Sequence, residues 1–233
     1  MTTSGVTNYN PAASALTLTA FGRIGIRRTE VTTQHLQDAA TEANLLQVSI
    51  GSQQPNLWKS EVYQITLVAG TASYNLPSRM IAIQDVYITT VPSGSTASTD
   101  RVLGVMSLTE YDAQPNKTQQ APPTAYLIQK LTPTPTITFW QVPDSSATFT
   151  ANVRMLSRQE DVSMRNGLTL DMPYTYLDVF VAGLAHRLAR IYAPDKEVLR
   201  KADYMDALAI AQNVDTQDSV SLIIAPVMNG YWR

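Results

Sequence analysis

The chain has 233 residues, of which 44% are hydrophobic and 15% charged, with a formal net charge of −2 and no cysteine. This length is enough for one large or two small globular domains, and the lack of cysteine excludes disulfides and thiolate chemistry. A sequence pI near 5.7 excludes a general attraction to nucleic-acid phosphates, while the sparsely charged surface suits assembly with other proteins.

Two helices are predicted at the start of the chain. Asn10 and Pro11 are a typical N-cap and first-turn pair, and Gly22 or Gly25 is expected to end this helix. Thr32 or Thr33 caps the second helix, which should end by residue 55. The apolar residues at helical spacing are Ala13, Leu16 and Ala20 in the first helix and Leu36, Ala39, Ala43, Leu46 and Ile50 in the second.

The middle of the chain changes to β-branched and aromatic residues, which favour strands. Strands are predicted at residues 62–68, 81–88, 101–106, 124–129, 136–140 and 148–156. Proline-rich stretches separate several of them, and the Ser, Thr and Gly tract at 92–100 indicates an exposed hairpin loop. This spacing predicts an antiparallel β-sandwich or small barrel.

A helical hairpin is predicted over residues 172–217, with its turn at Pro194. The predicted core faces are Leu177, Val181, Leu184, Leu188 and Ile191 in its first helix, and Val198, Ala202, Met205 and Ala209, widened by Leu199 and Leu208, in its second.

Together these elements predict an α+β fold. We expect a four-helix bundle built from an N-terminal helical pair (1–58) and a C-terminal hairpin (166–218), with the β domain (59–165) inserted between them. Residues 219–233 are expected to form an extended C-terminal arm.

The arm is rich in apolar side chains that would be a liability in solvent. We expect it to dock on another subunit, with folding back onto the chain's own β domain as the alternative. The residues predicted to make this contact are Leu222, Ile223, Ile224, Val227, Met228, Tyr231 and Trp232.

No pattern indicates catalysis, a cofactor or a metal. His35 and His186 are the only histidines, and a polar helical face accounts for His186 better than catalysis does. Glu160 and Asp161 are adjacent in the sequence, which is more typical of a solvated turn than of an acid/base pair. No nucleotide-binding loop or nucleophile elbow occurs. The chain is not expected to be an enzyme or to cross a membrane, because its longest apolar run, 179–185, is far shorter than the roughly 20 residues that a bilayer span needs.

Several stretches, taken in order, resemble the head-to-tail adaptor proteins of short-tailed bacteriophages and their tail tubular relatives. They are the segment ending at Trp58, residues 74–77, the Glu-Tyr-Asp-Ala-Gln-Pro-Asn-Lys stretch at 110–117, Pro123, residues 136–144, and the hairpin starting at Pro173.

The resemblance implies a structural virion protein in the neck or tail, assembled in the host cytoplasm. It implies a homo-oligomeric ring, twelve-fold in known members, that binds the portal protein and the tail nozzle or tail tubular protein, with tail fibres as a further partner. DNA would pass through the lumen without specific binding. Residues 195–233 carry six acidic against four basic side chains, so this end or the β loops are expected near a neutral or acidic lumen.

Two alternatives remain open from the sequence. A tail-tube or tail-terminator protein of the same particle would share these features. A carbohydrate-binding β-sandwich would instead use aromatic side chains to stack on sugars, although aromatics in alternating strands are more often core. The aromatic residues concerned are Trp58, Tyr63, Tyr74, Tyr87, Tyr111, Tyr126 and Trp140.

Overall fold

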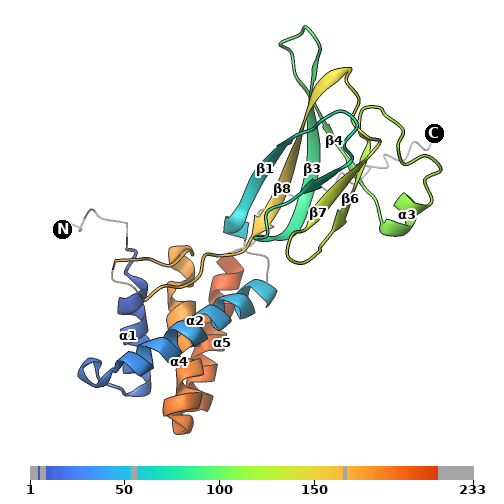
Figure 1. Cartoon of the computed structure of the whole chain (residues 1–233). Coiled ribbons are helices and arrows are strands. Elements are labelled where there is room, and N and C mark those ends of the chain that lie inside the picture. Colours follow the sequence, from blue (N-terminus) through green and yellow to red (C-terminus); the bar gives the residue numbers. More distant parts are fainter. Residues whose placement is uncertain (1–4, 6–8, 54–56, 165–166, 215–233) are drawn as a thin grey trace, which may run out of the picture.

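The computed structural model describes residues 5, 9–53, 57–164 and 167–214 and has an α+β fold. This part of the chain contains five α-helices and two four-stranded sheets. Four of the helices gather at one end of an elongated molecule and the sheets at the other (Figure 1). The chain starts in the helical part, crosses to the sheets and returns to the helical part.

The four predicted helices are present. They are α1 (Ala13–Ile24), α2 (Thr33–Gln53), α4 (Leu177–Tyr192) and α5 (Glu197–Val214), with a 3-10 turn at Pro194–Lys196 between the last two. The fifth helix, α3 (Leu108–Asp112), lies in the β part and was not predicted. Ser107 and Glu110 cap it reciprocally, which is a sequence signal that precedes many short helices.

The helix ends follow the expected chemistry. Gly25 ends α1 with a positive φ of 96°, a conformation that favours glycine. Thr32, rather than Thr33, caps α2, because its hydroxyl accepts a hydrogen bond from the His35 backbone while His35 Nδ1 accepts one from the Thr32 backbone. Lys196 Nζ donates to the Ile24 carbonyl oxygen at 2.7 Å, so the turn between α4 and α5 closes the C-terminal end of α1.

Helix α4 is the centre of the helical part. It contacts α1, α2 and α5, and its side chains are buried on nearly all sides. Gly183 lies where three helices meet, because a Cβ placed there would be 2.8 Å from Leu46 of α2 and 2.9 Å from Tyr204 of α5. One hydrophobic cluster therefore contains residues from all four helices, among them Leu46, Leu184 and Leu208.

The two sheets hold eight strands. The first has the order β1 (Ser60–Thr66), β8 (Ala147–Ser157), β3 (Met80–Pro92) and β4 (Thr99–Val102), and all of its pairs are antiparallel. The second has the order β2 (Ser73–Asn75), β7 (Thr136–Trp140), β6 (Ala125–Gln129) and β5 (Gly104–Val105). The predicted small barrel is wrong, because the strands form two separate sheets. The expectation of purely antiparallel pairing is also wrong, because β5 pairs with β6 in parallel.

The sheets bury a second hydrophobic cluster, to which both contribute. Val86, Ile88 and Val153 come from the first sheet and Ile137 and Phe139 from the second. Alternation along β3 and β8 places Val86, Ile88 and Val153 on the same face of the first sheet, as the period of a strand requires.

The predicted core face of α5 is wrong. Val198 is 82% exposed and Met205 54% exposed, and Ala202 and Ala209 are exposed as well. Of the two flanking positions, Leu199 is also exposed, whereas Leu208 is buried as predicted. The buried stripe joins Leu208 to Tyr204 and Ala211 and packs in the helical cluster. At the end of α4, Ile191 is also exposed, whereas the other four residues of its predicted face are buried.

Candidate protein-interaction site

In the part of the chain that the structure describes, the two histidines make ring contacts on different helices, and Glu160 and Asp161 lie on the surface. No group of three or more potential metal ligands occurs among those residues. Glu160 and Asp161 are exposed, and Asp161 pairs with Arg158 at 2.8 Å, in keeping with the predicted solvated turn. None of the described helices is both long and apolar enough to span a bilayer.

His186 is buried, in contrast to the polar face predicted for it. It is 7% exposed, its ring stacks on Tyr204 with centroids 6.2 Å apart, and its Nε2 lies 3.3 Å from Arg190 Nη2. Burial, together with the charge of Arg190, lowers the pKa of His186 below its ordinary value, and Glu197 at 3.7 Å opposes this effect. The side chain therefore serves the packing between α4 and α5.

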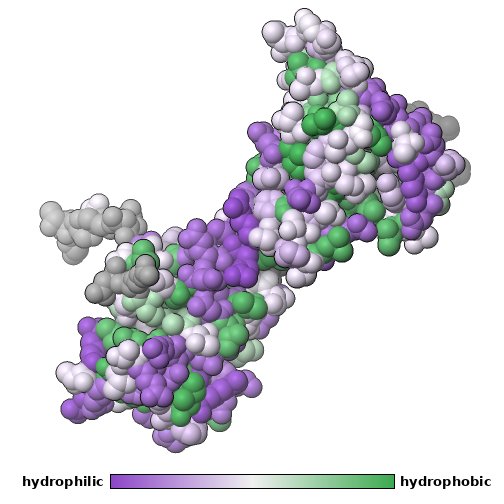
Figure 2. Space-filling view, in the orientation of Figure 1, coloured by the Kyte–Doolittle hydropathy of each residue, from purple (hydrophilic) through white to green (hydrophobic). Residues whose placement is uncertain are grey.

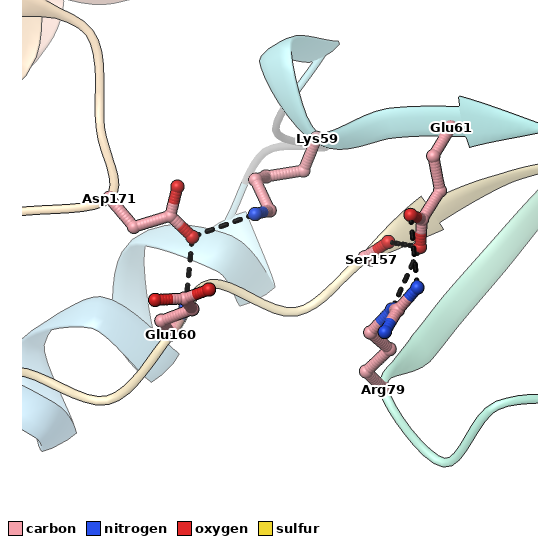
Figure 3. A network of polar contacts seen from close by, with 6 residues as sticks. All are labelled: Lys59, Glu61, Arg79, Ser157, Glu160 and Asp171. Carbon is pink, nitrogen blue, oxygen red and sulfur yellow. Dashed lines mark hydrogen bonds and ion pairs between the residues drawn. The ribbon is translucent and has the colours of Figure 1, made fainter.

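A polar network joins the helical and β parts (Figure 3). Asp171 accepts a hydrogen bond from Lys59 Nζ at 2.7 Å and another from the Glu160 backbone at 3.0 Å. Burial alone would raise the pKa of Asp171, but these two donors outweigh it and the pKa lies below its ordinary value. Lys59 lies where the chain enters the sheets and Glu160 where it returns from them. Asp171 therefore binds both segments that connect the helical and β parts.

A second cluster lies beside the first. Glu61 of β1 accepts hydrogen bonds from both Arg79 Nε, at 2.9 Å, and Arg79 Nη2, at 3.1 Å, and also from the Ser157 hydroxyl. The hydrogen bonds from Arg79 and Ser157 lower the pKa of Glu61. On the face drawn in Figure 2, hydrophilic residues gather at the waist between the two parts. Polar contacts thus hold the narrowest region of the molecule.

A groove of about 720 Å³ runs between the C-terminal half of α2 and the segment after β8. Its walls include the exposed apolar side chains Leu45, Val48 and Ile81. Gln47 and Gln159 also line it; they are 6% and 7% exposed, and amide atoms of both lack a hydrogen-bond partner among the described residues. The exposed apolar side chains of this groove suit a ligand that covers them with apolar groups, such as a polypeptide segment.

Sequence reasoning missed this groove. The helical period of α2 correctly identified Leu46 and Ile50 as core residues. Leu45 and Val48 lie on the adjacent face, outside the apolar spacing that predicted the core. The two glutamines come from segments more than 100 residues apart, and only the tertiary structure brings them together.

Four of the seven aromatic residues considered for sugar binding are buried or pack against one of the two hydrophobic clusters. Tyr126 is buried, Tyr63 and Tyr74 pack against the β cluster, and Trp58 packs against the helical cluster with its ring 4.6 Å from that of Tyr176. These four side chains therefore serve packing, which is the more common role of aromatics in strands.

The predicted arm and its seven contact residues lie outside the described residues. For this chain, no curated protein is a match. A protein-family model described as "SU10 adaptor protein" matches residues 12–226, which include both the helical and the β part. Because this match covers most of the chain, the protein belongs to the SU10 adaptor protein family.

Proposed function

We propose that the protein is a ring-forming head-to-tail adaptor that joins the portal to the tail nozzle and extends the DNA channel. The observation that carries this proposal is the family match over residues 12–226, which supports a bacteriophage adaptor and structural virion protein. Such a family is generally not enzymatic. Exposed apolar side chains on α5 and in the groove beside α2 support assembly, because partner proteins would cover them.

Within the ring, we propose that the four long helices act as one bundle and the two sheets as one inserted sandwich. The helical unit comprises residues 1–58 and 166–218, and the β unit comprises 59–165. The separate hydrophobic clusters of the two parts support this division. The copies would enclose a neutral or acidic lumen through which DNA passes, and we propose twelve copies, assembled in the host cytoplasm.

The arm at residues 219–233 is proposed to dock on the portal ring through its apolar side chains. A chain that ends at Asp218 should remain folded, because it keeps every described residue of the two hydrophobic clusters. It should fail to bind purified portal rings in a pull-down, while the full chain binds. A truncated protein that unfolds, or that binds portals as the full chain does, contradicts the docking arm.

Cryo-electron microscopy of the virion tests the main proposal. A ring of this chain between portal and nozzle is expected. Density elsewhere in the tail would instead indicate a tail-tube or tail-terminator protein, and absence from the particle would reject a virion role altogether.

A further inference from the structure

The outward face of α5 is an apolar stripe with nothing packed on it among the described residues. Val198, Ala202, Met205 and Ala209 repeat at intervals of four, three and four. They are exposed and lie roughly 100° around the helix from the buried Tyr204 and Leu208. A stripe of this period is typical of a helix that packs against another helix.

The outward face of α1 has the complementary shape. Ala15, Thr19 and Gly22 are exposed, and they lie opposite the buried side of α1. The Thr19 hydroxyl already donates to the Ala15 carbonyl oxygen at 3.0 Å, so covering it would leave no donor unpaired. Leu18, Gly22 and Ile26 help to line a shallow groove of about 560 Å³ along this face. Small side chains beside a groove let a second helix approach closely.

These two faces point in different directions. Helices α1 and α5 both pack on α4 and flank it on its two sides (Figure 1). The stripe of α5 therefore cannot reach the face of α1 in the same copy. A contact between two different faces of identical chains is heterologous, and such contacts form closed rings when the rotation closes.

The two faces also lie at the same level of the molecule. The hydrogen bond from Lys196 to the Ile24 carbonyl shows that the start of α5 lies beside the end of α1. A rotation about an axis parallel to these helices would bring the start of α5 in one copy to the end of α1 in the next. Exposed Arg27 and Arg28 follow α1 and exposed Asp195 precedes α5, and none of the three forms an ion pair with another described residue.

We propose that the occupant of both faces is a second copy of this chain: the Val198–Ala209 stripe of one copy packs on the Ala15–Gly22 face of the next, with Asp195 beside Arg27 and Arg28. This inference rests on the proposed function, because it names the subunit contact of the ring. It assigns that contact to the helices and leaves the sheets free for other partners.

Cysteine cross-linking tests the contact, because the native chain has no cysteine. Two proteins, Gly22→Cys and Val198→Cys, are made separately, mixed under conditions in which the wild type is oligomeric, and treated with a short bismaleimide. The mixture should yield a cross-linked dimer and each protein alone should not. Val198→Cys mixed with Val102→Cys, which is on the exposed strand β4, is the control and should yield none. Dimers formed by Val198→Cys alone would show an α5–α5 contact instead and overturn the proposal.

Substitutions test the same contact by sedimentation. Val198→Asp and Gly22→Trp should each weaken self-association roughly ten- to a hundredfold, because each removes or blocks apolar packing. Val102→Asp, the same change at an exposed valine of strand β4, should have little effect. Asp195→Lys should weaken association, and adding Arg28→Asp should restore it. Circular dichroism checks that every variant is folded.

The outcomes separate this inference from the proposed function. Rings that form normally in Val198→Asp and Gly22→Trp overturn the helical contact but leave the adaptor role intact. A wild-type protein that stays monomeric at all concentrations and with portal rings present overturns both.

Discussion

Gly183 sets how closely α2 and α5 approach α4. A methyl group there would meet buried side chains of Leu46 and Tyr204 at under 3 Å. We expect Gly183→Ala to lower the free energy of unfolding by about 1–2 kcal/mol, because overpacking outweighs the gain in helix propensity. Urea denaturation measures this change in the free energy of unfolding. The matched control is Gly22→Ala, where no atom lies within 4 Å of the added Cβ, and this change should stabilise by about 0.5–1 kcal/mol. Equal effects from the two changes would contradict the close approach.

His186 should make stability depend on pH. Burial lowers its pKa in the folded protein, so the unfolded chain binds this proton more readily. The contribution of His186 to folding stability is therefore complete above the pKa of histidine in the unfolded chain, which is near 6.5. This contribution is lost as pH falls from there toward the lower pKa of His186 in the folded protein. We expect the free energy of unfolding to fall less between pH 7.5 and 5.5 in His186→Gln than in the wild type. Identical pH dependence in the two proteins would contradict this role.

At the scale of elements, α5 shows why a helical period can mislead. It carries two apolar stripes, one through Val198 and Met205 and one through Tyr204 and Leu208. Both satisfy the spacing of a buried face, and the sequence cannot say which one meets α4. The structure buries the stripe with Tyr204, whose ring packs on Gly183 and His186.

The crossings between the helical and β parts depend on Asp171. Asp171→Asn removes the charge that pairs with Lys59, and we expect a loss of about 1 kcal/mol in the free energy of unfolding, because the pair is only partly exposed. Asp112→Asn, which breaks the more exposed pair with Lys117, should cost less than about 0.5 kcal/mol. Chemical denaturation compares the two, and an equal loss would mean that the crossing is not held by this carboxylate.

At the scale of the whole molecule, two hydrophobic clusters lie at opposite ends of an elongated chain. If they unfold as separate units, calorimetry should resolve two transitions. Leu184→Ala, in the helical cluster, should then lower the midpoint of only one of them, and Met155→Ala, in the β cluster, only the other. Each change should cost about 2–5 kcal/mol, because both side chains are fully buried. If both variants shift the same single transition, the two parts fold as one unit.

The sequence by itself determined most of the elements of this protein, but not the short helix α3 or strand β2. Local signals are strong enough for that: Gly25 ends α1, Thr32 starts α2, Pro194 separates α4 from α5, and β-branched runs form most of the strands. The resemblance to phage adaptors rested on the order of such stretches, and the family match agrees with it.

Only the tertiary structure decided which faces are covered. A helical period specifies that a face is apolar but not which neighbour buries it, so Val198 and Met205 were expected in the core and lie in solvent. The groove beside α2 and the position of Asp171 depend on residues far apart in the sequence. Likewise, two sheets and a barrel share the same strand pattern, because closure depends on which edges pair, and pairing between distant strands is not encoded by local alternation.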